Sequence, residues 1–300
     1  MKPVNIQIKD FLRSSLLEAG AAAVGFARAE EVDAPTIERF AGWLARGDSG
    51  PLGYMDNYPE LRRDPRGLLE GCRTVISTAW VYNPSRLRAP ELPRIARYAY
   101  CEDYHKALRR VLKPLCRAWE EHVDGLKWRI CIDSAPVMER YWAVKAGVGF
   151  CGRNGCLIVP GIGSWVFLAE ILINADVEPD IPCADCCKGC GLCVDRCPAG
   201  ALREDGTIDC RKCRSALTVE APGGAGPGAP LAGCDVCQEC CPHNAGAPVA
   251  TVPQLAVLEQ VFGLDERQIR EMDEESFKAG FSRSALSRIG LKGLRANLDA

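Results

Sequence analysis

The stretch "CADCCKGCGLCVDRCP", residues 183–198, carries six cysteines in sixteen positions, more than any one metal site can use. The whole chain has 18 cysteines in 300 residues, and twelve of them fall between Cys183 and Cys241. In a reducing compartment, clustered thiols are more often metal ligands than disulfides. We therefore expect this part of the chain to fold around its metals.

The composition around this stretch is that of a globular protein. Of the 300 residues, 47% are apolar and 25% are charged, which fits one large domain or two to three smaller ones. No apolar run approaches the ~18 residues of a membrane span, and charges interrupt residues 1–20, unlike a signal peptide. We expect a cytoplasmic protein with no membrane partner. The net charge of -2 means that a nucleic-acid partner would need a local basic patch.

The periodicity divides the chain into three predicted segments: residues 1–179, 180–247 and 248–300. The first alternates helices and strands, which predicts a mixed α/β or α+β fold around a mixed sheet. Its predicted helices are 5–19, 35–46, 103–123 and about 136–146, and its predicted strands or apolar runs are 73–82, 126–133, 156–160 and 164–173. Short polar loops and cysteines fill the second segment, and the third returns to helix.

The cysteine spacing predicts iron–sulfur clusters. Cys187, Cys190, Cys193 and Cys197, followed by Pro198, form the bacterial ferredoxin pattern C-x2-C-x2-C-x3-C-P. The first three thiolates of this pattern bind one 4Fe-4S cluster, and the fourth binds the other cluster of a pair. A zinc site more often uses two separated pairs of ligands, so iron–sulfur is favoured over zinc.

A second run ends at Cys241 and Pro242, but Leu231 occupies the position where its first cysteine would stand. The nearest upstream replacements are Cys210 and Cys213. The simplest assignment gives one cluster Cys187, Cys190, Cys193 and Cys241, and the other Cys197, Cys213, Cys234 and Cys237. A competing register pairs Cys240 with Cys234 and Cys237, but it abandons the Cys-Pro ending. The cysteines left over by the simplest assignment are Cys183, Cys186, Cys210 and Cys240.

Two clusters alone support only electron transfer, so the first segment is expected to hold an electron acceptor. Residues 133–172, "DSAPVMERYWAVKAGVGFCGRNGCLIVPGIGSWVFLAEIL", resemble the epoxyqueuosine reductase family. Other pieces match the same family in the same order along the chain: 61–76, 96–108, the ferredoxin run, 213–220 and 233–244. The resemblance implies an oxidoreductase that uses cobalamin, reduced by two 4Fe-4S clusters, to convert epoxyqueuosine in tRNA to queuosine. It also places a cysteine where Cys213 stands, and cobalamin in the first segment.

The resemblance further implies the roles of individual residues. It makes Asp133 the proton donor to the epoxide oxygen, and it places five further residues near the cobalamin: Arg62, Arg153, Asn154, Ser215 and Asp235. Local sequence offers Asp133 another role, as the N-cap of the following helix. The two roles conflict, because a helix N-terminus favours the carboxylate whereas a general acid needs a raised pKa. We therefore expect apolar groups or the corrin to surround Asp133.

No histidine lies in the D-x-H-x-x-G pattern of a cobalt ligand, so His105 is expected to serve helix packing or a hydrogen bond. Cys151 is the one thiol of the first segment that we consider for cobalt. The expected partners are the anticodon region of tRNA and an external electron donor such as a flavodoxin or ferredoxin.

Five basic residues of the third segment would form either a solvated face or a tRNA contact: Lys278, Arg283, Arg288, Lys292 and Arg295. Two alternative functions stay open at this point. One is a related corrinoid reductase acting on a small molecule, as reductive dehalogenases do. The other is a non-catalytic iron–sulfur electron carrier.

Overall fold

A four-stranded antiparallel sheet organises the first part of the computed structural model, which describes residues 4–187 and 189–300. Its strand order is β1 (Ala23–Arg28), β2 (Thr74–Val81), β6 (Val166–Ile173) and β3 (Trp128–Cys131). All three pairings are antiparallel, so the α+β class is confirmed and the expected mixed sheet is wrong. All eight residues of β2 are buried, a pattern that is typical of parallel strands covered on both faces.

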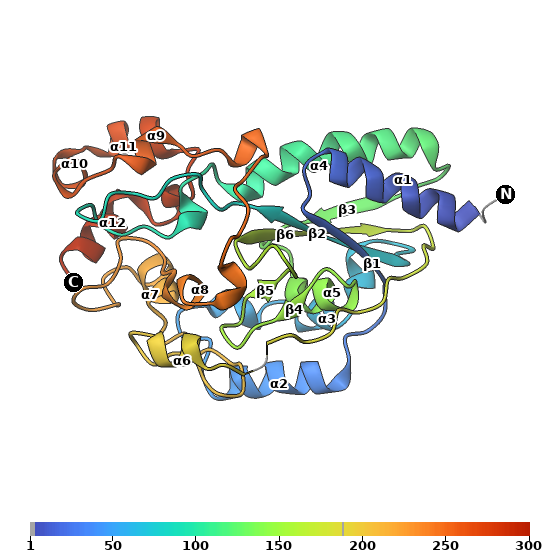
Figure 1. Ribbon diagram of the computed structural model, residues 1–300, viewed down its shortest axis with the longest axis horizontal. Coiled ribbons are helices and arrows are strands. Elements are labelled where there is room, and N and C mark those ends of the chain that lie inside the picture. Colours follow the sequence, from blue (N-terminus) through green and yellow to red (C-terminus); the bar gives the residue numbers. More distant parts are fainter. Residues whose placement is uncertain (1–3, 188) are drawn as a thin grey trace.

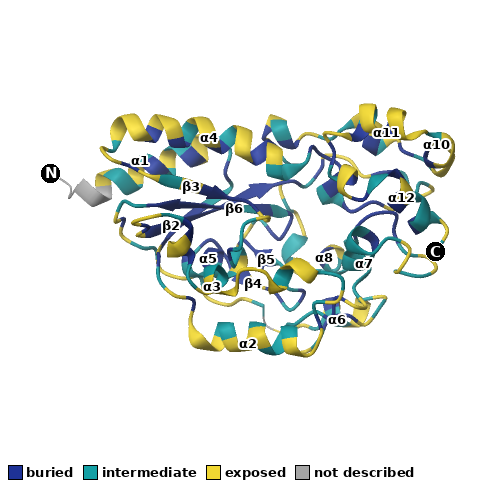
Figure 2. Cartoon of the chain, turned by 180° about the vertical axis from the view of Figure 1, so that it is seen from behind, coloured by how far each residue is buried: buried dark blue, intermediate teal, exposed yellow. Residues whose placement is uncertain are grey.

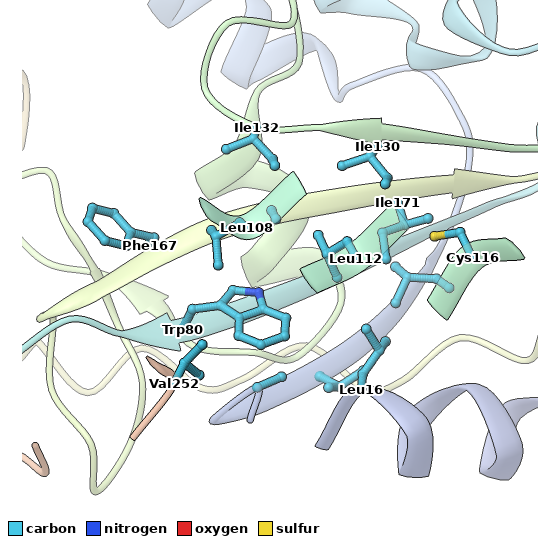
Figure 3. Close-up of a cluster of buried hydrophobic side chains, with 14 of the residues drawn as sticks. Leu16, Trp80, Leu108, Leu112, Cys116, Ile130, Ile132, Phe167, Ile171 and Val252 are labelled. Carbon is cyan, nitrogen blue, oxygen red and sulfur yellow. The ribbon is translucent and has the colours of Figure 1, made fainter. Parts of the chain in front are cut away.

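Helices cover both faces of this sheet (Figure 1). On one face, α1 (Val4–Glu18) and α4 (Tyr104–His122) enclose a core that includes Leu16, Trp80 and Leu112 (Figure 3). On the other face, α5 (Glu139–Lys145) and α3 (Pro59–Arg63) pack against residues such as Val75 and Leu172. Each large apolar side chain that is fully buried contributes about 1.5–3 kcal/mol. Val252 and Leu255 of the C-terminal segment complete the first of these cores.

The cysteine-rich segment is built from short helices joined by loops: α6 (Leu192–Arg196), α7 (Arg214–Glu220) and α8 (Val236–Glu239). Asp48 follows α2 (Ala34–Ala45) in the chain and is fully buried. It joins the first segment to the cysteine-rich segment, because its carboxylate accepts hydrogen bonds from Arg203 (2.7 Å) and Arg211 (2.8 Å). A hairpin of β4 (Phe150–Cys151) and β5 (Leu157–Ile158) follows α5 in the chain.

The C-terminal segment contains α9 (Glu259–Phe262), α10 (Glu266–Glu271), α11 (Glu274–Phe281) and α12 (Gly290–Leu298). These helices surround a third apolar core, and their outward faces are exposed (Figure 2). Asn297 joins them to the cysteine-rich segment by donating to the carbonyls of Thr218 and Leu231, each at 2.8 Å. None of the helices in the described part of the chain is long and apolar enough to cross a membrane.

Six short 3-10 helices complete the described structure: η1 (Gly53–Asp56), η2 (Pro65–Leu68), η3 (Arg97–Ala99), η4 (Pro242–Asn244), η5 (Pro253–Leu255) and η6 (Ala285–Arg288).

Candidate active site and cluster sites

A cavity of about 480 Å³ lies where the three segments meet. The first segment contributes ring and carboxylate side chains to its wall, the cysteine-rich segment contributes thiols and a hydroxyl, and the C-terminal segment contributes one guanidinium. These lining residues are Tyr98, Tyr104, His105, Asp133, Cys197, Cys213, Ser215, Cys234, Cys237 and Arg288.

Asp133 leaves the end of β3 in an unusual backbone conformation. Its φ is 52°, in the left-handed region that L-residues other than glycine seldom adopt, although aspartate is among the more tolerant. Its backbone N–H donates to the carboxyl of Glu139, the first residue of α5. The N-cap of α5 is Met138, so the interpretation of Asp133 as a helix cap is wrong. The Asp133 side chain is 52% exposed because it faces the cavity.

His105 holds the Asp133 carboxylate. Its Nε2 lies 3.0 Å from Oδ2 of Asp133, and its Nδ1 lies 2.7 Å from Oδ1 of Asp103. Asp103 also caps α4 by accepting the backbone N–H of His105, which fixes the ring at the start of the helix. The predicted hydrogen-bonding role of His105 is confirmed. Its partner across the cavity wall, 28 positions further along the chain, was not predicted.

The electrostatics of this pair differ from the sequence-based expectation. Partial desolvation in the cavity wall raises the pKa of Asp133, but the hydrogen bond and charge of His105, together with Tyr104, lower it below its ordinary value. Burial lowers the pKa of His105, yet its hydrogen bonds to Asp103 and Asp133 raise it to about 9. At neutral pH, Asp133 is therefore ionised and His105 carries the proton. We expected apolar groups of the protein, or the corrin, to surround Asp133. Among the protein groups this is wrong, because His105 lies against the Asp133 carboxylate.

The predicted cluster ligands separate into two groups in space. The four assigned to one cluster line a second cavity of about 430 Å³: Cys187, Cys190, Cys193 and Cys241. The four assigned to the other all line the first cavity. Of the surplus cysteines, Cys186 lines the second cavity and Cys210 the first, whereas Cys183 and Cys240 line neither. Among residues 4–187 and 189–300, no three metal-binding side chains converge closely enough to share a single ion.

The other predicted cofactor contacts are placed unevenly. Asn154 is buried between the two cavities and lines both, and its side-chain amide donates to the carbonyl of Cys237 at 3.2 Å. Ser215 lines the first cavity and Arg153 the second. Within the described chain, Arg62 and Asp235 lie outside both linings. The Arg62 guanidinium donates to backbone carbonyls, including that of Tyr54, and Asp235 accepts the backbone N–H of Arg97.

Two further residues differ from their expected places. Cys151 does not line the first cavity, whereas Cys156, five positions later, does. Arg288 was predicted only as part of a basic stripe, but it lines the cavity and pairs with Glu220 at 2.7 Å.

Most of the predicted basic stripe is bound within the chain. Arg283 pairs with Glu102, and Arg295 donates to the last carbonyls of α10. Lys278 and Lys292 are exposed. The five side chains therefore do not act as one free basic face.

Comparison with known proteins decides the family. The model of the family "Epoxyqueuosine reductase QueG, DUF1730" matches residues 62–134. The epoxyqueuosine reductase of Gloeobacter violaceus is 37% identical over 312 residues, covering 99% of this chain and 95% of the relative. This chain belongs to the epoxyqueuosine reductase family. The enzyme of Cellulophaga algicola in this family is 32% identical, covering 97% of this chain and 96% of the relative. The chain is accordingly an oxidoreductase.

Solved structures of epoxyqueuosine reductases have the same fold. A crystal structure of an epoxyqueuosine reductase with an epoxyqueuosine-modified tRNA-Tyr stem loop superposes with a TM-score of 0.86 at 28% identity, covering 97% of this chain and 80% of that one. The Streptococcus thermophilus enzyme superposes with a TM-score of 0.81 at 28% identity, over 98% of this chain and 79% of that one. A Bacillus subtilis structure, with a TM-score of 0.85 at 27% identity, is described as having its catalytic aspartate loop swung out of the active site; it covers 97% of this chain and 80% of that one.

Proposed function

We propose that this enzyme reduces the epoxide of epoxyqueuosine in tRNA to the alkene of queuosine, with Asp133 and His105 delivering a proton to the epoxide oxygen. One observation carries the proposal: the Asp133–His105 pair and the four cysteines assigned to one cluster line the same cavity. Electrons and protons can therefore be supplied to a substrate within one space. Family membership supports the same reaction.

The residues around the two cavities fit two 4Fe-4S clusters and a cobalamin. Each cavity has four assigned thiols in its wall, and the register with Cys240 is less favoured because that residue lines neither. Cobalamin reduced by the clusters supplies a strongly reducing cobalt centre. Asn154 and Ser215 are the proposed cobalamin contacts that line the first cavity. The family resemblance also implies cobalamin contacts for three residues that do not line the first cavity: Arg62, Arg153 and Asp235.

The proton balance of the reaction shows that the enzyme must deliver protons as well as electrons. Converting an epoxide to an alkene consumes two electrons and two protons and releases one water molecule. We place the first proton on the path from Nε2 of His105 to Oδ2 of Asp133 and on to the epoxide oxygen as the C–O bond breaks. The 3.0 Å contact is within the distance for direct transfer. Because His105 holds the proton at neutral pH, Asp133 does not need a raised pKa of its own.

The proposed partners follow from this reaction. The substrate is the anticodon region of tRNA, as the stem-loop complex of a relative supports. An external donor such as a flavodoxin or ferredoxin would reduce the clusters. A reaction on tRNA places the protein in the cytoplasm.

Reconstituted protein tests the proposal. We expect about eight irons per chain, bound cobalamin, and reduction of an epoxyqueuosine-modified stem loop that requires both cofactors. Iron without corrin would instead indicate an electron carrier. Bound corrin with turnover of organohalides but not of the stem loop would indicate a small-molecule reductase.

A further inference from the structure

Two glutamates, the fully buried Glu170 and the partly buried Glu139, lie beneath the Asp133 loop and have no part in the reaction described above. Glu170, on β6, is fully buried, and its Oε1 accepts from the hydroxyl of Ser77, its cross-strand neighbour on β2, at 3.0 Å. Its Oε2 is buried without a hydrogen-bond partner among the described residues. Glu139 lies against it from the first turn of α5. No Lys, Arg or His of the described chain forms a salt bridge with either carboxyl.

A carboxyl pair that is largely withdrawn from water and has no salt-bridge partner favours the protonated form, because a desolvated carboxylate without a counter-ion is costly. Burial and the neighbouring Glu139 raise the pKa of Glu170 well above its ordinary value. Burial and the charge of Asp133 raise the pKa of Glu139 to about 8. Both carboxyls therefore favour the neutral form more strongly than an exposed glutamate does. A neutral Glu139 can accept a hydrogen bond without placing a second negative charge beside the Asp133 carboxylate.

The hydrogen bond that Glu139 accepts comes from the most constrained point of the loop. Asp133 and Tyr58 are the only residues other than glycine with a positive φ in the described chain. Such a conformation persists only where the surroundings fix it. The loop has two anchors at this residue, because Glu139 accepts its backbone N–H and His105 binds its side chain. The direction of the carboxyl depends on both.

We propose that Glu139 is a positioning residue, whose carboxyl oxygen fixes the left-handed backbone of Asp133 and thereby holds the Asp133 carboxylate against His105 and in the cavity. Glu170, which interacts with the Glu139 carboxyl, supports it from β6. The inference rests on the proposed role of Asp133 in proton delivery. It assigns Glu139 no contact with substrate or cofactor.

Two substitutions separate this role from a general one in folding. Glu139→Gln keeps an acceptor oxygen at the same distance along the side chain, and Glu139→Leu removes the acceptor while filling the space. We expect Glu139→Gln to reduce the modified stem loop within about threefold of the wild-type kcat. We expect Glu139→Leu to lose about 100-fold in kcat, the size of effect that a 1 Å misplacement causes. KM, iron content and cobalamin content should stay unchanged.

A matched control and a second readout complete the test. Glu271→Leu makes the same change on the exposed surface of α10 and should leave kcat unchanged. Crystal structures of the two Glu139 variants report the Asp133 loop directly: φ of Asp133 should stay positive in Glu139→Gln and change in Glu139→Leu. If the Glu139→Leu variant does not retain its clusters, Glu139→Met, which also lacks the acceptor oxygen, is used in its place.

The outcomes distinguish the inference from the proposed function. A wild-type rate in Glu139→Leu, or an equal loss in Glu139→Gln, would overturn the positioning role. If the wild-type enzyme itself does not reduce the stem loop, the proposed function fails. The φ of Asp133 in the variant structures still decides whether Glu139 fixes the loop.

Discussion

The first segment and the cysteine-rich segment are stabilised in different ways. In the first, large apolar side chains such as Trp80, Trp119 and Trp142 are fully buried between the sheet and its helices. In the second, the helices α6, α7 and α8 have five, seven and four residues, too few to be stable alone. The difference indicates that apolar packing stabilises the first segment, whereas the second needs bound clusters to hold its thiols together.

Removal of the clusters should have the largest effect on activity, and it tests the difference between the two segments most directly. Anaerobic chelation of iron should abolish activity and make residues 180–247 sensitive to proteolysis, while the first segment stays protected. Limited proteolysis with mass spectrometry measures both regions in one sample. Equal protection of both segments after iron removal would show that the cysteine-rich segment does not depend on its clusters.

Asp133→Asn should cause the next largest loss. General acid–base catalysis contributes about 10²–10⁴-fold, so we expect kcat to fall by about 10³-fold with clusters and cobalamin still bound. Asp124→Asn, at an exposed position outside the cavity lining, is the matched control. Retained turnover in Asp133→Asn would remove this residue from the proton path.

His105→Gln should cost about 10–100-fold in kcat and change the pH profile. The raised pKa of His105, about 9, means that the protonated ring is present below this pH and is lost as pH rises through it. Wild-type activity should therefore fall near pH 9, and the variant should lack this limb. The same sign holds for stability: the contribution of the His105 ion pairs is full below pH 6.5 and disappears as pH rises through 9. A limb near pH 9 that persists in His105→Gln would assign it to another group.

Reversing Lys278 and Lys292 to Glu should have the smallest effect. Both lysines are exposed, whereas three of the other basic residues are bound within the chain. If they contact the tRNA backbone, its affinity should fall and the slope of log K against log salt should decrease by roughly 0.7 to 0.9 per lost contact. Filter binding at several salt concentrations measures this slope. An unchanged slope would place the tRNA contact elsewhere on the enzyme.

The sequence predicted what depends on local spacing. The helices at 5–19, 35–46 and 103–123 match α1, α2 and α4 to within one residue at each end, and the spacing of the cysteines sorted eight of them into two groups that line two cavities. Strand β1 was missed, because "AVGFAR" lacks the alternation of a strong strand pattern and has a glycine in its interior.

Contacts between distant residues could not be predicted from the sequence. His105 and Asp133 lie on different elements, and only the packing of α4 beside β3 brings them together. The pairing of Glu139 with Glu170 likewise depends on α5 packing across the sheet. The lowered pKa of Asp133 follows from the first of these contacts, whereas the general-acid role implied by the family resemblance had led us to expect a raised one.

Nucleoside analysis of tRNA from cells that lack this protein tests the central claim most directly. Epoxyqueuosine should accumulate in place of queuosine, and the wild-type gene should restore queuosine, whereas an Asp133→Asn copy should not. Unchanged queuosine in cells without the protein would contradict its assignment as the epoxyqueuosine reductase of those cells.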